Sequence, residues 1–264
     1  SDSMKIFLEL PFIVSIIILS VASIAVFFAA ERLFRRKIPH ELMIENHEVG
    51  GFLYNAVCVI YAVLMAFVVF VIWNNLEETN SKIEGEANNL LNLYYDAAIY
   101  PDSIKKEIHS QIREYVKRVT NEEWLSLGEG KRDDEAQKIF IRLNRIFLSV
   151  NSSQIPNSEV LSQSVKNLHE LREFRRHRLL ASKQNMPDIL WLVLILSSII
   201  LVAFTFFFST KFIRHQYIMT AFLVLVCVLV LYLIYVLDHP FVGSNAIKPD
   251  AFQPLIDIVN RAAK

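Results

Sequence analysis

Residues 49–73 read VGGFLYNAVCVIYAVLMAFVVFVIW. This stretch contains no charged side chain, and Asn55 is its most polar residue. A helix needs about 20 consecutive apolar residues to cross roughly 30 Å of hydrocarbon. The apolar residues also do not keep to one side, as they do in a surface helix. The stretch therefore predicts a membrane-spanning helix.

Three further stretches, 10–30, 189–209 and 217–237, are also free of charge. Four buried helices of a large soluble protein are the alternative, but such helices seldom stay uncharged over about 20 residues. A basic segment, 31–37, follows the first stretch where a signal peptide would have its cleavage site, so we expect a retained anchor. We predict four spans in two pairs.

The composition agrees with a membrane protein and argues against a nucleic-acid partner. Hydrophobic residues make up 53% of the 264 residues, and the 27 basic side chains are balanced by 27 acidic ones. A nucleic-acid-binding protein needs a basic excess to neutralise phosphates. The two cysteines, Cys58 and Cys227, both fall inside predicted spans, where we expect small packing residues rather than a disulfide.

The segment between the two pairs of spans predicts a bundle of helices. Its apolar residues recur at helical spacing, and the alternating pattern of a strand is missing. Leu76–Tyr94 continues the second span as a helix, Pro101 opens the next helix, and Gly128–Gly130 ends it. Four apolar stripes then face one another: Leu76, Ile83, Ala87, Leu90, Tyr94; Ile104, Ile108, Ile112, Tyr115, Val116, Val119; Ile139, Leu143, Ile146, Phe147, Val150; and Val160, Leu161, Val165, Leu168, Leu171.

The predicted fold class is therefore all-α. Residues 6–74 hold the first two spans, 75–188 the extramembrane bundle, 189–237 the last two spans, and 238–264 a C-terminal tail.

Charges beside the spans predict the orientation. The short loops 31–48 and 210–216 carry basic residues close to span ends, and such loops stay in the cytoplasm. This count puts the protein in a cell (inner) membrane, with the bundle on the non-cytoplasmic side. A basic cluster before the third span favours the opposite orientation, with the bundle in the cytoplasm. Its members are Arg172, Arg175, Arg176, Arg178 and Lys183.

Catalytic and metal-binding motifs do not emerge from the sequence. It contains no Walker loop, no Gly-x-Gly-x-x-Gly, no Gly-x-Ser-x-Gly and no His-Glu-x-x-His, so we predict neither an enzyme nor a cofactor. Two clusters could hold a metal. For the first we favour a salt-bridged, solvated helix face, and for the second a loop whose residues cap a helix and pair with basic side chains. The two clusters are, in this order, His169, Glu173, His177 beside Arg172, Arg175 and Arg176, and His40, Glu41, Glu45, His47, Glu48 beside Arg35, Arg36 and Lys37.

The second span carries a stripe of small and mildly polar residues. Its members recur at spacings of three or four: Gly51, Asn55, Cys58, Ala62 and Ala66. Such a stripe can line a narrow pore. It can equally let two helices approach closely, with Asn55 hydrogen-bonding across the contact.

Acidic residues gather at the opposite span ends. Asp238 closes the fourth span, where a carboxylate opposes the helix dipole, so we expect a cation, His239 or a basic side chain to compensate it. Together with Glu77 and Glu78, and with Glu9 and Asp188, it could form a vestibule that attracts cations. Capping of the turn at Pro240 is the alternative.

Several segments resemble a bacterial membrane protein family known as bestrophin-like, whose function is uncharacterised. They are 47–55, 60–70, 86–88, 123–124, 237–243 and Pro249. The resemblance implies two spans, a helical insert and two more spans in a bacterial membrane. The name bestrophin implies a pentameric anion channel with its insert in the cytoplasm, opposite to the loop charges. The spans carry no bestrophin pore signature, so no pore residue is transferred.

Together these features predict a homo-oligomeric ion channel whose second span lines the pore. Its partners are the lipid bilayer, further copies of the chain, and ions. The alternative is a non-conducting scaffold or sensor whose bundle binds another protein.

Overall fold

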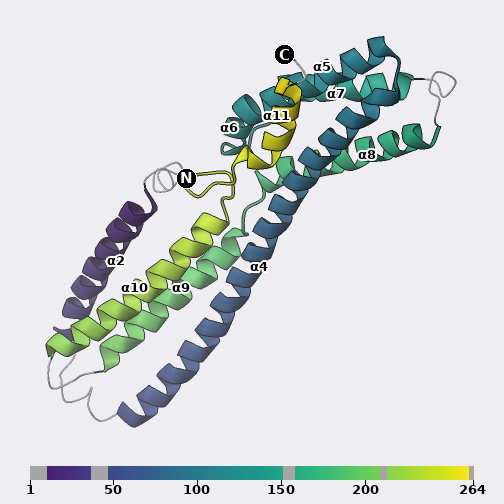
Figure 1. Ribbon diagram of the computed structural model, residues 1–264. Coiled ribbons are helices and arrows are strands. Elements are labelled where there is room, and N and C mark those ends of the chain that lie inside the picture. Colours follow the sequence, from purple (N-terminus) through teal and green to yellow (C-terminus); the bar gives the residue numbers. More distant parts are fainter. Residues whose placement is uncertain (1–10, 37–46, 151–157, 209–212, 262–264) are drawn as a thin grey trace. The chain divides into compact units, whose positions relative to one another are not determined.

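The computed structural model describes residues 11–36, 47–150, 158–208 and 213–261, and all regular elements in these ranges are helical. The all-α prediction is confirmed. The longer helices, labelled in Figure 1, are α2 (Phe12–Arg35), α4 (His47–Asp96), α5 (Asp102–Arg118), α7 (Asp134–Ser149), α8 (Ser158–Ala181), α9 (Asp188–Phe204), α10 (Ile213–Leu237) and α11 (Gln253–Arg261).

The chain divides into two compact units. The first, here the membrane unit, holds the described residues up to Asn74 with Asn185–Asp238 and Val242–Asn245. The second, here the bundle unit, holds Asn75–Gln184, His239–Phe241 and the described residues from Ala246 onward.

Among the described residues, four helices are long and apolar enough to cross a bilayer, and their apolar parts lie in the membrane unit. They cover all but a few end residues of the four predicted stretches, so the prediction of four spans is confirmed. Pro11 and Pro187 stand at the N-caps of α2 and α9, where their fixed φ suits the start of a helix. Within the unit, α2 and α9 each pack along α10.

Side chains of α4, α9 and α10 form the interior of the membrane unit. Met65, Val68 and Ile72 of α4 pack with Leu194 and Ile234. Many other apolar side chains of these helices remain on the surface of the single chain. Lipid or a neighbouring protein must cover so large an apolar surface.

Helix α4 is one unbroken helix of 50 residues. Its first half carries no charged residue from Val49 to Trp73, whereas beyond Asn75 only one stripe is buried, including Ile83, Leu90 and Tyr94. The prediction that the second span runs on as a helix beyond residue 76 is therefore confirmed.

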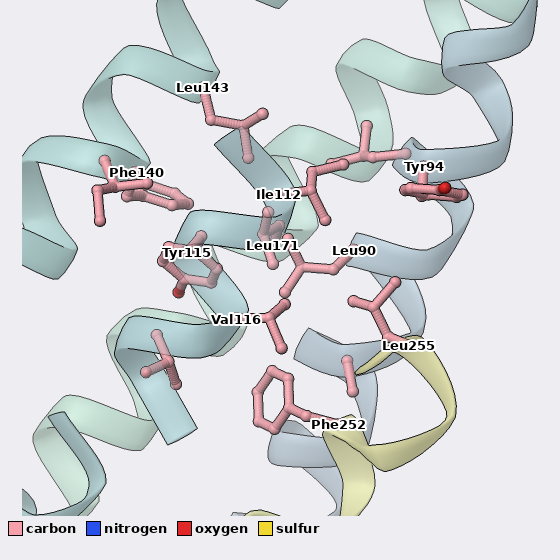
Figure 2. Packing of buried hydrophobic residues seen from close by; sticks show 14 of the residues in the cluster. Leu90, Tyr94, Ile112, Tyr115, Val116, Phe140, Leu143, Leu171, Phe252 and Leu255 are labelled. Carbon is pink, nitrogen blue, oxygen red and sulfur yellow. The ribbon is translucent and has the colours of Figure 1, made fainter. Parts of the chain in front are cut away.

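The bundle unit packs the second half of α4 with α5, α7 and α8 around one apolar core. The predicted stripes supply its centre, with Ile112, Leu143 and Leu171 fully buried, as Figure 2 shows. Helix α5 begins after Pro101 and passes through a π-helical turn, η2 (Val119–Glu123), into α6 (Trp124–Leu127). The chain then turns at Gly130, whose φ of 68° favours glycine.

The C-terminal segment completes this core. A 3₁₀ turn, η5 (Pro249–Phe252), leads into the amphipathic α11. Phe252 and Leu255 are buried beside Leu90 and Val116, as Figure 2 shows. Residues that the sequence suggested only as a tail thus supply part of the bundle's interior.

Candidate functional site

The five residues of the second-span stripe do not share one environment. Asn55, Ala62 and Ala66 are exposed on α4, and Gly51 is half-buried, with no atom within 4 Å of where a Cβ would lie. Cys58 instead packs against the cluster that contains Leu201 and Val202. Most of the stripe therefore lies outside the contacts between the described helices.

A neighbouring face of α4 makes the contacts within the membrane unit. Tyr61 and Ser198 share a hydrogen bond of 2.7 Å between their hydroxyls, and Met65 and Val68 are buried beside Leu194. Asn55 has no hydrogen-bond partner within the described part of the chain. A helix that packs against Asn55 is therefore not among the described helices of this chain.

Asp238 is buried and joins the two last spans. One carboxylate oxygen accepts the backbone N–H of Met186 at 2.8 Å, and the other accepts Trp191 Nε1 at 3.4 Å. Met186 directly precedes Pro187, the N-cap of α9, and Trp191 lies in the first turn of that helix, so the carboxylate lies at a helix N-terminus, where a negative charge is favourable. Although Asp238 follows the C-terminus of α10, the N-terminal end of α9 thus offsets its unfavourable position.

The other predicted vestibule residues lie elsewhere in the chain. Glu77 and Glu78 are exposed residues of the bundle unit, and Glu78 lies 3.5 Å from His177 Nε2. Glu9 lies outside the described residues. An ion vestibule formed by Asp238 with Glu77 and Glu78 therefore stays a prediction.

The predicted metal clusters gain no support from the described ranges, which contain no group of three His, Cys, Asp or Glu residues able to hold an ion. Glu173 pairs with Arg176 at 2.7 Å on the exposed face of α8. Of the loop cluster, His40, Glu41 and Glu45 lie outside the described residues. Arg35, expected to pair with that loop, pairs with Glu31 of its own helix at 2.9 Å.

A buried network of charges lies inside the bundle unit. Arg178 binds both oxygens of Glu86, Nε at 2.7 Å and Nη2 at 3.0 Å, and Nη2 also donates to Glu123 at 3.0 Å. Arg175 binds Glu123 through two hydrogen bonds of 2.7 Å. Tyr115 closes the network: it accepts from Arg175 at 2.9 Å and donates to Glu86 at 2.6 Å.

Opposite charges keep this network ionised despite its burial. Burial alone would raise the pKa of Glu86, but Arg178 and Arg175 hold that pKa below its ordinary value. Burial likewise disfavours the charged arginines, yet Glu86 and Glu123 raise the pKa of Arg178. Two cations face two anions, so the network is neutral and nearly every hydrogen-bonding site is used.

Aromatic rings enclose the two guanidinium groups. Arg178 Cζ lies 5.3 Å from the Trp124 ring centre, and Arg175 Cζ lies 5.3 Å from Tyr115 and 5.5 Å from Phe140. These distances suit cation–π contacts. Only two nitrogens of the network, Arg175 Nε and Arg178 Nη1, have no partner within the described part of the chain.

The sequence interpretation of this part of α8 as a solvated, salt-bridged face is wrong for Arg175, which is buried. Arg178, which the sequence offered only as part of the basic cluster before the third span, is buried as well. The apolar stripe that ends at Leu171 continues to these two positions at spacings of four and three. That continuation was the available signal. A buried charge is tolerated at these positions because acids from distant segments lie beside it. The sequence carried no signal that those acids would be there.

Three segments that carried the family resemblance meet in this unit: 86–88 supplies Glu86, 123–124 supplies Glu123 and Trp124, and 237–243 supplies Phe241. Trp124 donates its indole N–H to the carbonyl of Ile247 at 2.8 Å. Its ring packs against Phe241 and Phe252, with centroids 5.9 and 6.0 Å apart. The residue before Trp124 is Glu123 of the charge network, so the scattered motifs specify one packed region.

A sequence profile of the Bestrophin-like domain matches residues 17–252. The chain belongs to the Bestrophin-like family. No curated protein gives a significant match.

Solved structures share the fold of this Bestrophin-like protein. A bacterial bestrophin homologue from Klebsiella pneumoniae superposes with a TM-score of 0.66 at 11% identity, covering 92% of this chain and 96% of the other. A point variant of a Klebsiella homologue gives 0.68 at 12% identity, with 92% and 98% covered. A variant of a protein described as a membrane protein gives 0.69 at 12% identity, with 92% and 96% covered. At such low identity the likeness shows the fold alone.

Proposed function

We propose that this Bestrophin-like protein is a homo-oligomeric ion channel and that α4 lines its pore. The observation that carries the proposal is the exposed Asn55 on the apolar half of α4. An unpaired amide is costly in hydrocarbon, so polar side chains within spans face protein or a water-filled cavity. In an oligomer, the half-buried Gly51 and the exposed Asn55, Ala62 and Ala66 would face either a neighbouring protein chain or a water-filled cavity.

The need for several copies follows from the same geometry. Met65, Val68 and Ile72 of α4 pack directly against α9 and α10. One chain with four spans has little room for a water-filled path between them. Copies arranged around an axis can place their α4 stripes toward a shared pore while covering exposed apolar surface.

Planar-bilayer recording of the purified protein tests the channel proposal. We expect single-channel currents and an oligomer in mild detergent. Asn55→Leu should change conductance while the protein still folds and assembles. Phe52→Leu, at another exposed position of the same helix, should leave conductance unchanged. A folded monomer that carries no current across several ions and pH values would instead support the scaffold or sensor.

For the ion vestibule, the proposal rests on Glu77 and Glu78, because Asp238 is engaged by α9. Exposed carboxylates near a pore raise the local concentration of cations. Replacing both with glutamine should shift the reversal potential in a KCl gradient toward the equilibrium potential of chloride. An unchanged reversal potential would contradict their role.

The loop charges support an inner-membrane protein with the bundle on the non-cytoplasmic side. The family resemblance implies the opposite side. A single cysteine introduced at Gly128, in a background without Cys58 and Cys227, would report the side through a membrane-impermeant label. Labelling in intact spheroplasts is expected from the loop charges, and labelling only after lysis would reverse the orientation.

A further inference from the structure

We propose that a pocket beside α7 and α8 of the bundle unit binds a small organic phosphate. The pocket has a volume of about 800 Å³ and is lined only by residues between Arg132 and Lys183. A pocket of this size suits a small-molecule ligand. The proposal is independent of ion conduction, because no residue of the lining belongs to a membrane span.

The lining carries more positive than negative charge. Its cations are Arg132, Arg172, Arg175, Arg176 and Lys183, and its one acid is Asp134. Three of the cations already have carboxylate partners: Arg132 binds Asp134, Arg175 binds Glu123, and Arg176 binds Glu173. Arg172 and Lys183 have no carboxylate partner within the described ranges, and they leave two positive charges uncompensated.

Arg172 is held in place without being neutralised. Its Nη2 donates to Oδ1 of Asn144 at 3.0 Å, and the same buried amide donates to the carbonyl of Phe140 at 2.7 Å. A neutral partner fixes the guanidinium but leaves its charge and its other N–H groups for a ligand. Such preorganisation lowers the entropy lost on binding.

Arg175 also lines the pocket, as a buried residue of α8. Arg175 is almost fully buried, and its Nε has no partner within the described part of the chain. Buried donors normally have a partner from protein, water or ligand. Because two hydrogen bonds to Glu123 already engage the charge of Arg175, Arg172 and Lys183 are the cations of the lining that remain for a ligand.

The ligand class follows from the charge and from the apolar lining. A phosphate monoester carries about −1.5 to −2 charges near pH 7, which matches the two uncompensated cations. Arginine forks suit phosphate oxygens. Phe140, Ile141, Leu179 and Leu180 also line the pocket, so we expect the phosphate to carry an apolar or aromatic group.

Calorimetry with the full-length protein in mild detergent and phosphate-free buffer tests the proposal, with phenyl phosphate as the probe. We expect saturable binding at one site per chain. Arg172→Gln and Lys183→Gln should each weaken binding by about tenfold, the range for a charged hydrogen bond. Both side chains are exposed, so these variants should fold. Inorganic phosphate should bind more weakly than phenyl phosphate, and phenol should not bind.

The matched controls are Arg145→Gln on α7 and Lys166→Gln on α8, which remove exposed charges outside the pocket. They should change the affinity by less than about twofold. Absence of saturable binding, equal weakening by all four variants, or equal affinity for phosphate and phenyl phosphate would overturn the proposal. A phosphatidate headgroup offers the same chemistry. Competition by phosphatidate in nanodiscs would identify a lipid source, and unchanged phenyl phosphate binding there would identify a soluble one.

Discussion

Arg178 on α8 binds both carboxylate oxygens of Glu86 on α4, at 2.7 and 3.0 Å, and both side chains are fully buried. The pair joins segments that lie 92 residues apart in the sequence. The pair connects the second half of α4 to α8 inside the bundle. Because both side chains are buried there, water cannot replace either partner.

Removing Arg178 should strongly destabilise the bundle. Arg178→Leu leaves the buried Glu86 without its main counter-charge, and breaking a buried pair in this way costs about 3–5 kcal/mol. Urea unfolding followed by tryptophan fluorescence would measure the loss, because Trp124 lies in this core. Adding Glu86→Leu should recover part of it.

The control for that experiment is Arg176→Leu. Arg176 and Glu173 form an exposed pair on the same helix. Such pairs contribute about 0–1 kcal/mol, so little stability should be lost. Equal losses for Arg178→Leu and Arg176→Leu would mean that the buried network does not stabilise the fold.

Acid should weaken the bundle through Glu86. Its folded-state pKa lies below its ordinary value of 4.5, so the unfolded chain binds the proton more tightly. The stabilisation is therefore fully present above about pH 4.5 and is lost as the pH falls through the folded pKa. Unfolding free energies between neutral pH and pH 3 should decrease, and Glu86→Gln should flatten the decrease. An unchanged slope in Glu86→Gln would exclude this carboxyl as the source.

Gly85 should show strong coupling to Phe174. A Cβ at Gly85 would lie 2.8 Å from two ring atoms of Phe174, so Gly85→Ala should destabilise the bundle by about 1–3 kcal/mol. In a Phe174→Ala background the clash is absent, and the same change should stabilise the helix by about 1 kcal/mol. A double-mutant cycle in urea measures the coupling. Additive effects would show that the ring moves aside freely.

Gly51 tests the oligomer rather than the fold of one chain. No atom lies within 4 Å of the point that a Cβ would occupy at Gly51, so one chain has room for a side chain there. If the stripe meets another copy, Gly51→Leu should reduce the oligomer fraction in size-exclusion chromatography while helix content stays constant. An unchanged oligomer fraction would show that Gly51 does not lie in the contact between copies of the chain.

Asp238 should matter more than an exposed aspartate. Asp238→Asn removes a buried charge at the N-terminal end of α9 and should cost about 1–2 kcal/mol. Asp257→Asn, on the exposed face of α11, should change stability by less than about 0.5 kcal/mol. Thermal unfolding in detergent compares the two. A similar midpoint for both variants would contradict the importance of the Met186 and Trp191 contacts.

The sequence by itself determined the four spans, the all-α class and the helical nature of the insert. These properties are local: absence of charge over a bilayer's thickness, apolar spacing of three and four, and helix boundaries at Pro101 and Gly128–Gly130 can be read along the chain. The continuity of α4 beyond Leu76 followed from the same spacing.

Only the tertiary structure decided which polar residues are buried and what they bind. The spacing along the chain did not reveal that Arg175 and Arg178 are buried, because a charged residue is tolerated inside only where distant partners meet it, here Glu86, Glu123 and Tyr115. Asp238 is likewise tolerated as a buried charge because donors at the N-terminal end of α9, distant in sequence, lie beside it. The uncompensated charge of Arg172 likewise depends on its lying beside Asn144 rather than a carboxylate, which is a property of three-dimensional packing and not of spacing along the chain.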